Sequence, residues 1–300
     1  MLRWIFTGSA GIRAGWSIAI FFAIVAIENV TFFFIAKSFH ARFNQTGELA
    51  PLVMLVRETT FVILIAIPTY IMSRIEGQPF LGYGYSGPNK LSRLLWGMLT
   101  GCVALSALVG ILVLTHSIVI DKINLSGGSA FVYGLIWLII FLLVGIAEES
   151  ATRGYLLFTL RRGINFFWGS IILSIGFGLV HLSNPGETPL GIVAAASIGL
   201  VFCLSLWLTG SLFWAVGIHA TWDWSQSFLF GVADSGLRTQ GHFLDTHPNG
   251  NVLLSGGGTG PEGSVFVLLI ISLVALGLYL VWGRKPALRD KGSLFAQSSS

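Results

Sequence analysis

Long apolar segments dominate this chain, and they constrain its fold more than any other feature. An apolar window of about 17 to 25 residues is long enough to cross the hydrocarbon core of a bilayer as a helix. Such windows lie near residues 14–36, 51–72, 94–115, 131–160, 165–182, 189–208, 211–230 and 264–282. We therefore predict an all-α protein, a polytopic membrane helix bundle of about eight transmembrane helices.

The composition agrees with a membrane protein. Only 10% of the residues are charged, 54% are hydrophobic and the mean hydropathy is +0.81, whereas a soluble globular domain has about 25% charged residues. The first window is too long, and too weakly followed by small residues, to be a signal peptide. Cys102 and Cys203 both lie in apolar windows, so neither a disulfide framework nor a cysteine metal site is expected.

The charges and loops suggest how the chain is organised. We assign residues 1–130 to three N-terminal transmembrane helices with their loops, residues 131–283 to a core of helices 4–8, and residues 284–300 to a polar C-terminal tail. Lys and Arg gather in the loops on the side of the N-terminus, so we expect both termini to be cytoplasmic. No basic patch with interleaved aromatic residues is present, which argues against nucleic acid as a partner.

Three ionisable residues directly follow an apolar run in the stretch GIAEESATRGYL, residues 145–156. Each such residue inside a bilayer costs about 2.5 to 3.5 kcal/mol. Glu149 and Arg153 are spaced i,i+4 with the acid first, which favours an ion pair. Glu148 is turned roughly 100° from Glu149 on a helix, so its partner must lie elsewhere.

Charged residues also occur in the first two apolar windows. Glu28 and Arg57 fall at similar depths in the bilayer and could pair across their two helices. The alternative is that Arg57 reaches the interface and pairs with its neighbour Glu58.

More polar side chains occur in the apolar windows of the second half. His219 and Asp223 are spaced i,i+4, so they project from one face of a helix. A hairpin turning at Gly163 would bring Glu148 and His181 to similar heights, within about 5 Å along the helix axes. We therefore expect Glu148, His181, His219 and Asp223 to converge from three helices.

Two chemistries suit these four side chains. Two carboxylates and two imidazoles could all ligate a divalent metal, most readily zinc. In a site without metal, Glu148 would act as a general base toward water with help from His181, while His219 and Asp223 would hold the oxyanion. The sequence has no H-E-x-x-H zincin motif.

These motifs together resemble the CAAX protease and bacteriocin-processing (CPBP) family of intramembrane proteases. EESATRGYL from Glu148 resembles its first motif, EExxxR followed by Gly. FGLVH, ending at His181, resembles its FxxxH motif, and SLFWAVGIHATWDW from Ser211 resembles its third region. The resemblance covers about residues 131–270 and is nearest to bacterial chains of the type II CAAX prenyl endopeptidase kind.

The resemblance implies an intramembrane endopeptidase that hydrolyses a peptide bond in a membrane-anchored protein or peptide. Glu148, His181, His219 and Asp223 would form the site, and Glu149 with Arg153 would brace it. Members have been described both as metalloproteases and as glutamate proteases. The resemblance further implies a lipid environment, in a bacterial cell membrane.

Two positions depart from the family pattern. Thr152 stands where an aromatic residue is usual, and Asp223 stands where the prenyl proteases have Asn. The extra carboxylate favours a bound metal or a protonated Asp223.

Other functions remain open from the sequence. A non-catalytic membrane scaffold or a bacteriocin self-immunity protein could retain the same fold. A transporter is less favoured, because no pair of interrupted helices occurs in matching halves.

Overall fold

The computed structural model describes residues 6–8, 11–38, 48–284 and 286–288. The main helices of this part are α2 (Ala14–Ser38), α3 (Pro51–Ile75), α4 (Lys90–Leu114), α5 (Gly127–Arg153), α6 (Tyr155–Ile164), α7 (Phe166–Val180), α8 (Pro189–Thr209), α9 (Phe213–Trp224) and α11 (Phe266–Trp282). Shorter helical pieces are η1 (Phe80–Gly82), η2 (His181–Ser183), the π-helix η3 (Ser225–Leu229), α10 (Val252–Ser255) and η4 (Pro261–Gly263). The prediction of an all-α bundle is confirmed.

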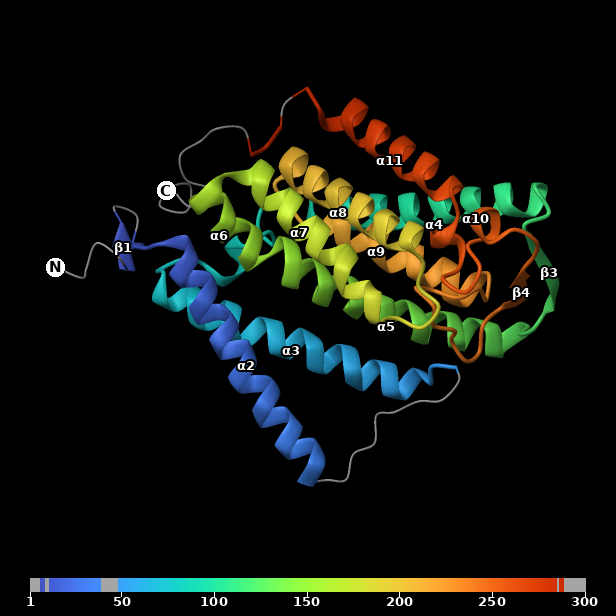
Figure 1. The fold of residues 1–300 in the computed structure, drawn as a ribbon, viewed down its shortest axis with the longest axis horizontal. Coiled ribbons are helices and arrows are strands. Elements are labelled where there is room, and N and C mark those ends of the chain that lie inside the picture. Colours follow the sequence, from blue (N-terminus) through green and yellow to red (C-terminus); the bar gives the residue numbers. More distant parts are fainter. Residues whose placement is uncertain (1–5, 9–10, 39–47, 285, 289–300) are drawn as a thin grey trace.

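Two small antiparallel ribbons accompany the helices. β1 (Thr7–Gly8) pairs with β2 (Gly11–Ile12), and β3 (Ile118–Ile123) pairs with β4 (Leu244–Pro248). The second ribbon joins the loop after α4 to the long loop after α9, at one end of the bundle (Figure 1).

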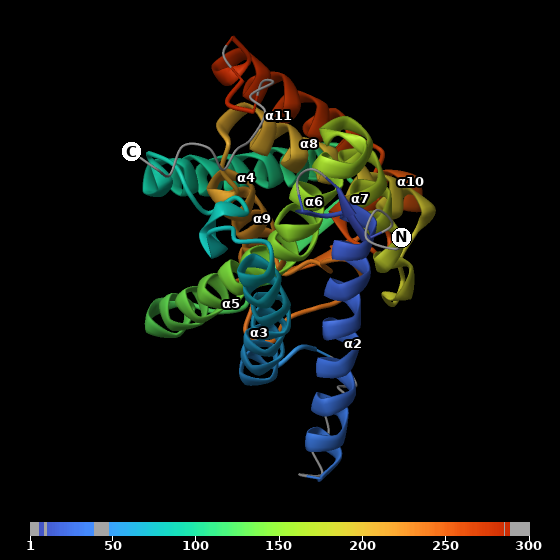
Figure 2. The same cartoon turned by 90° about the vertical axis from the view of Figure 1, so that its left-hand side faces the viewer.

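The helices surround α9, which packs against α4 and α5 (Figure 2). α7 and α8 pack against each other, and α11 covers α8 and α4 on the outside. On the opposite side α3 packs against α5, while α2 crosses α3 and diverges from it along its length (Figure 1). The interior of the molecule is therefore built around one short helix.

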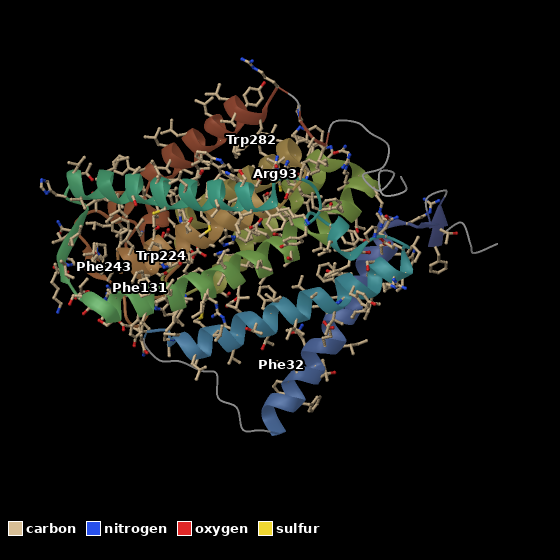
Figure 3. All side chains as sticks on the ribbon, turned by 180° about the vertical axis from the view of Figure 1, so that it is seen from behind. Phe32, Arg93, Phe131, Trp224, Phe243 and Trp282 are labelled. Carbon is tan, nitrogen blue, oxygen red and sulfur yellow. The ribbon has the colours of Figure 1, made fainter. Side chains whose placement is uncertain are left out.

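Within the described residues, six segments are long and apolar enough to cross a membrane: Ala14–Phe34, Pro51–Ile75, Lys90–Leu114, Gly127–Ile164, Phe166–Ser183 and Pro189–Thr209. Large apolar side chains are exposed on the outer faces of these helices. Figure 3 shows the side chains radiating from the ribbon, with the exposed Phe131 near the beginning of α5. An apolar exterior of this extent fits contact with lipid, so the chain is a polytopic membrane protein.

The predicted span at residues 211–230 is a different kind of element. α9 contains 12 residues, which at 1.5 Å per residue is about 18 Å, short of the ~30 Å hydrocarbon core. Every residue from Trp214 to Asp223 is buried, because neighbouring helices enclose α9. An apolar sequence is expected both for a helix buried in protein and for a helix exposed to lipid, so the sequence of α9 did not distinguish the two. The predicted count of eight spans is accordingly approximate.

The predicted helix at residues 131–160 is also divided. α5 ends at Arg153, and the chain turns at Gly154, where ψ is −125°, before α6 begins. A Cβ atom at Gly154 would overlap the carbonyl oxygen of Ser150. The glycine that follows the EExxxR motif therefore permits a sharp break, and this break places Glu148 in the last turns of α5.

The predicted pairing of Glu28 with Arg57 is wrong. Arg57 Nε donates to Glu58 Oε1 at 2.7 Å, whereas neither carboxylate oxygen of Glu28 has a hydrogen-bond partner in the described part of the chain. The divergence of α2 from α3 explains the difference (Figure 1). The alternative, a local pair of Arg57 with Glu58, is confirmed.

Most of the predicted tail, residues 284–300, lies outside the described residues. The short described piece at residues 286–288 returns to the bundle, where the Leu288 N–H donates to the carbonyl of Trp207 and the Leu288 side chain is buried. The division of the chain at residue 130 stays a prediction.

Glycines bring α4 and α9 into backbone contact. A Cβ atom at Gly97 would overlap the carbonyl oxygen of Trp214, and one at Gly217 would overlap that of Leu94. Thr221 Oγ1 donates across the same contact to the carbonyl of Met98 at 2.7 Å. Small residues allow this close approach in membrane proteins. The contact fixes the position of the helix that carries His219 and Asp223.

This contact predicts an asymmetry between two glycines of α4. Gly97→Ala should lower the free energy of unfolding by about 1 to 3 kcal/mol, because the added methyl group overpacks the α4 to α9 contact. Gly110→Ala is the matched control, since nothing lies within 4 Å of a Cβ atom there. Thermal unfolding in detergent measures both variants. Equal stability of the two variants would contradict the described packing.

Candidate active site

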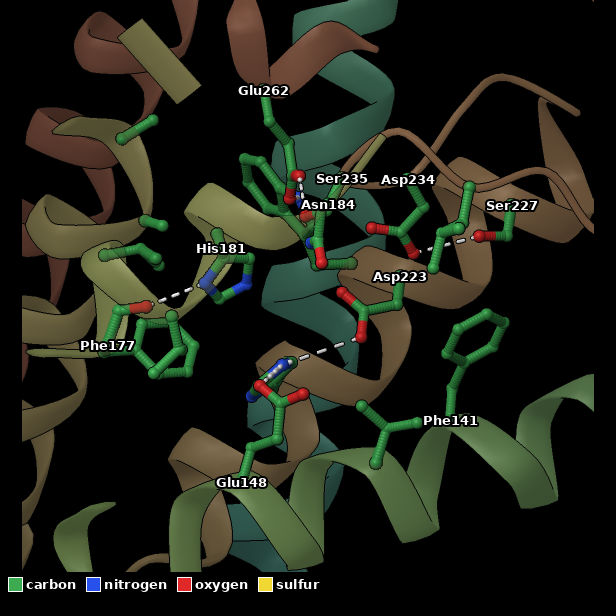
Figure 4. A pocket seen from close by; sticks show the side chains of 18 of the residues that line it. Phe141, Glu148, Phe177, His181, Asn184, Asp223, Ser227, Asp234, Ser235 and Glu262 are labelled. Carbon is green, nitrogen blue, oxygen red and sulfur yellow. Dashed lines mark hydrogen bonds and ion pairs between the residues drawn. The ribbon is translucent and has the colours of Figure 1, made fainter. Parts of the chain in front are cut away.

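One cavity of about 480 Å³ lies inside the bundle, and all four predicted site residues line it: Glu148, His181, His219 and Asp223. Its walls come from α3, α5, α7, α8, α9 and α11 and from the loop after η3. Figure 4 shows Glu148 reaching in from α5, opposite Asp223, Asp234 and Glu262. The structure thus brings the predicted residues to one cavity, while their catalytic roles stay predictions.

Glu148 faces the cavity from α5. Its side chain is 29% exposed, and its Oε2 lies 3.6 Å from His219 Nε2. Ala151 and Thr152 follow it along the same cavity wall. Thr152 Oγ1 donates to the carbonyl of Glu148 at 2.7 Å, so the Thr152 hydroxyl is satisfied within α5.

Glu149, the next residue of α5, is completely buried. Its Oε1 accepts a hydrogen bond from Arg153 Nη1 at 3.0 Å, which confirms the predicted ion pair. The Arg153 guanidinium also lies 4.4 Å from the ring centroid of Phe177 and 5.3 Å from that of Phe202. The guanidinium lies over the faces of both rings, which stabilise its positive charge. The charge of Arg153 is therefore enclosed by Glu149 and by two aromatic rings.

Glu149 also contacts His219, which the sequence analysis did not predict. The same Oε1 atom lies 3.0 Å from His219 Nδ1. A carboxylate at one ring nitrogen fixes the orientation of a histidine and directs the other nitrogen toward its target. His219 Nε2 is held in this way at 3.6 Å from both Glu148 Oε2 and Asp223 Oδ2. Glu149 therefore positions the His219 ring within the cavity.

Two aromatic rings complete the surroundings of His219. Phe202 stacks on the imidazole with ring centroids 5.4 Å apart and an interplanar angle of 18°, and Phe177 meets it edge-on at 6.2 Å. His219 is only 8% exposed. Its ring therefore has little freedom to turn away from Glu148.

His181 occupies a separate part of the cavity wall, at the end of α7. Its Nδ1 lies 2.7 Å from the carbonyl oxygen of Phe177 (Figure 4). A carbonyl oxygen only accepts hydrogen bonds, so Nδ1 carries the proton and Nε2 is the available ring nitrogen. His181 forms no ion pair with the described carboxylates within 4.0 Å. It lines the cavity without joining the pair of Glu148 and His219.

The chain changes its helical geometry directly after Asp223. η3 is a π-helix, a rare form that is often found at functional sites. It carries Ser227, whose hydroxyl donates to Asp234 Oδ2 at 2.9 Å. The π-turn thereby connects the C-terminal end of α9 to the loop that follows it.

Two acidic residues of the cavity were missed by the sequence analysis. Glu262 accepts hydrogen bonds from Trp222 Nε1 at 2.9 Å and from Ser235 Oγ at 3.0 Å. Asp234 lies in the loop after η3, where burial and the neighbouring carboxylates of Asp223 and Glu262 raise its pKa well above the usual range. Both residues occur in Gly-containing segments, FGVADSGL and GPEGS, outside the predicted apolar windows. The sequence alone does not indicate that a carboxylate in such a loop is directed into the protein.

Residues 130–225 match the family model described as type II CAAX prenyl endopeptidase Rce1-like. This segment is similar to the Rce1-like model. It contains all four predicted site residues together with Glu149 and Arg153, and the match confirms the resemblance stated from the motifs. No curated protein and no solved structure gives a significant match. Asp234 and Glu262 lie beyond the segment that matches the Rce1-like model.

The buried pair predicts the effect of neutralising Glu149. Glu149→Gln should lower the free energy of unfolding by about 3 to 5 kcal/mol, because Arg153 would be left buried without a counter-charge. Adding Arg153→Met should recover part of this loss, since the lone charge is then removed. Glu148→Gln is the matched control, and it should change stability little because the Glu148 side chain is partly exposed to the cavity.

Thermal unfolding of the purified variants in detergent measures these differences. A Glu149→Gln protein with the stability of the original chain would contradict the structural role of the ion pair.

Proposed function

We propose that this Rce1-like membrane protein is an intramembrane endopeptidase that hydrolyses a peptide bond of a membrane-delivered protein or peptide, with Glu148 as the general base. The proposal rests on one observation above all. Glu148 and His219 face each other in the same cavity at 3.6 Å, inside the segment that matches the Rce1-like model. A carboxylate and an imidazole at this separation leave room for a water molecule or a carbonyl group to contact both.

The charges around His219 suggest its role. Glu148, Glu149 and Asp223 all lie within 3.6 Å of its ring nitrogens, and negative charge favours the doubly protonated imidazolium. In that form Nδ1 donates to Glu149, and the Nε2 proton is directed into the cavity. A fixed donor of this kind stabilises the oxyanion that develops as a carbonyl is attacked.

The reaction then follows in two steps. Glu148 accepts a proton from water while the water oxygen bonds to the carbonyl carbon, and His219 Nε2 donates a hydrogen bond to the resulting oxyanion. The tetrahedral intermediate then collapses, the carbon–nitrogen bond breaks, and Glu148 returns the proton to the departing amine. His181, whose Nε2 is available on the cavity wall, would bind the attacking water or the leaving group.

The metal alternative, with Glu148, His181, His219 and Asp223 as ligands of a divalent ion such as zinc, stays a prediction. These four side chains line one cavity, and two carboxylates and two imidazoles are ligands that zinc accepts. We base no step of the proposed reaction on a metal.

The cavity walls suit a substrate that arrives through the membrane. Apolar side chains of α3, α5, α7 and α8, including Phe61, Phe141, Val180 and Ile198, line most of it, and apolar walls accept lipidic or apolar peptide segments. Prenylated CAAX tails are one such class, as the family description suggests, and unprenylated membrane peptides are another. We further propose that the chain lies in a bacterial cell membrane with both termini in the cytoplasm.

Glu148→Gln tests the proposed function. The purified protein in liposomes is incubated with prenylated CAAX peptides and with unprenylated membrane-anchored peptides, and mass spectrometry identifies the products. Loss of the general base should reduce the cleavage rate by about 10² to 10⁴-fold while thermal stability is retained. Glu28→Gln is the matched control, because Glu28 is an acidic residue of α2 that does not line the cavity.

Retained turnover in Glu148→Gln would refute its role as the base. Absence of cleavage by the original chain with every peptide would instead favour the alternative, a membrane scaffold or a self-immunity protein.

A further inference from the structure

The cavity wall carries a cation that the proposed reaction does not use. Among the described residues that line the cavity, Arg57 of α3 is the one Lys or Arg side chain. Carboxylates line the same cavity at Glu148, Asp223, Asp234 and Glu262. An anionic group on a substrate is therefore repelled by these carboxylates and attracted by Arg57.

The position of Arg57 on α3 places it on the face of the helix that borders the cavity. Met54, Arg57 and Phe61 all line the cavity, and their spacings of three and four residues put them on one helical face. Val56 and Ile63 of the same helix are exposed and do not line the cavity. Arg57 therefore belongs to the cavity wall and not to the surface of α3 that contacts lipid.

Glu58 anchors one side of the Arg57 guanidinium. Arg57 Nε donates to Glu58 Oε1 at 2.7 Å. The Arg57 side chain is 54% exposed and that of Glu58 is 3% exposed, and Glu58 does not line the cavity. The cation is thus accessible from the cavity, while its counter-charge is covered by protein.

The two terminal nitrogens of this guanidinium are available for a second partner. In the part of the chain that the structure describes, Arg57 donates through Nε, and its Nη1 and Nη2 atoms donate to no other residue. These atoms carry the remaining N–H donors of a planar fork, which matches the two oxygens of a carboxylate. Arg57 can therefore bind a second carboxylate while it keeps its bond to Glu58.

The chemistry of the cavity indicates which carboxylate this is. Apolar side chains such as Phe61 and Phe141 line much of it, and such walls suit an apolar peptide. Acidic side chains are rare in segments delivered through a membrane, because a charge is costly within the bilayer. The α-carboxylate of a free C-terminus is the one anion that such a peptide carries by necessity.

We propose that Arg57 binds the free C-terminal carboxylate of the substrate peptide and thereby determines which bond reaches Glu148. The proposal rests on the proposed function for the peptide nature of its ligand. With the carboxylate at Arg57 and the scissile carbonyl between Glu148 and His219, the peptide runs in one direction along the cavity. An extended chain advances by about 3.3 to 3.6 Å per residue, so the cleaved bond lies at a fixed, short distance from the C-terminus.

Peptide binding tests this proposal without relying on cleavage. An apolar, N-acetylated, dansyl-labelled peptide is made in two forms, one with a free C-terminal carboxylate and one with a C-terminal amide. Both are titrated into the Glu148→Gln variant in dodecyl maltoside. Energy transfer from tryptophan, of which Trp222 lines the cavity, reports binding, and excess unlabelled peptide defines its saturable part. The free acid should bind about 10- to 100-fold more tightly than the amide, because charge-assisted hydrogen bonds are lost in the amide.

Substitutions of Arg57 assign this preference to its guanidinium. Arg57→Gln should abolish the preference for the free acid, and Arg57→Lys should retain part of it, since the charge stays while the planar fork is lost. Arg74→Gln is the matched control, because Arg74 is an exposed cation in the last turn of the same helix and does not line the cavity. If the unpaired Glu58 prevents folding of Arg57→Gln, the double variant Arg57→Gln/Glu58→Gln takes its place.

The outcomes separate this proposal from the proposed function. Equal binding of the two peptide forms, or a preference that survives Arg57→Gln, would overturn the proposal. Arg57-dependent binding of phosphatidylglycerol without any preference between the peptides would also overturn it, because the guanidinium would then serve a lipid phosphate. An Arg57-dependent preference in a chain that cleaves neither form supports this proposal and contradicts the proposed function. Where cleavage occurs, Arg57→Gln should lower kcat/KM for the free acid by the same factor as binding and leave kcat/KM for the amide unchanged.

Discussion

The ion pair of Glu149 with Arg153 is the interaction on which the rest of this site depends. Both side chains are completely buried, and a buried charge without a partner destabilises a protein strongly. The pair fixes the last turns of α5, and the same Glu149 oxygen also contacts His219 on α9. One carboxylate therefore connects the stability of the bundle to the orientation of the imidazole that faces Glu148.

The central position of α9 follows from the packing of small residues. Because Gly97 and Gly217 lack side chains, the backbones of α4 and α9 approach one another directly, and α9 is enclosed by protein. His219 and Asp223 are thereby kept away from lipid and face an internal cavity. A polar pair on a helix exposed to lipid would instead face hydrocarbon, where it incurs the full cost of desolvation.

Regular periodicity explains what could be predicted from the sequence. The spacing of Glu149 and Arg153 predicted their ion pair, and the apolar windows predicted the membrane helices. The positions of Glu148, His181, His219 and Asp223 on three helices predicted a shared cavity. These inferences succeed because helical geometry relates spacing in the sequence to direction in space.

Contacts made by loops and by tertiary packing could not be predicted in this way. The contact of Glu149 with His219 joins residues far apart in the chain, and Asp234 and Glu262 lie in loops that have no periodicity. Hydropathy also failed to distinguish α9 from a membrane span, because a helix buried in protein and a helix exposed to lipid are equally apolar. The pairing assigned to Glu28 failed because similar depth in the bilayer does not bring diverging helices together.

The charged side chains of the cavity lie in two regions. Near Glu148 the carboxylate is partly exposed to the cavity and faces a histidine, which suits proton transfer with water. At the loop end, Asp223, Asp234 and Glu262 bring three carboxylates together beside neutral hydrogen-bond donors. Asp223 belongs to both regions, because it approaches His219 on one side and the loop carboxylates on the other. Asp223 therefore contributes a third carboxylate to the loop cluster while it approaches His219, a double position that its helical spacing alone does not reveal.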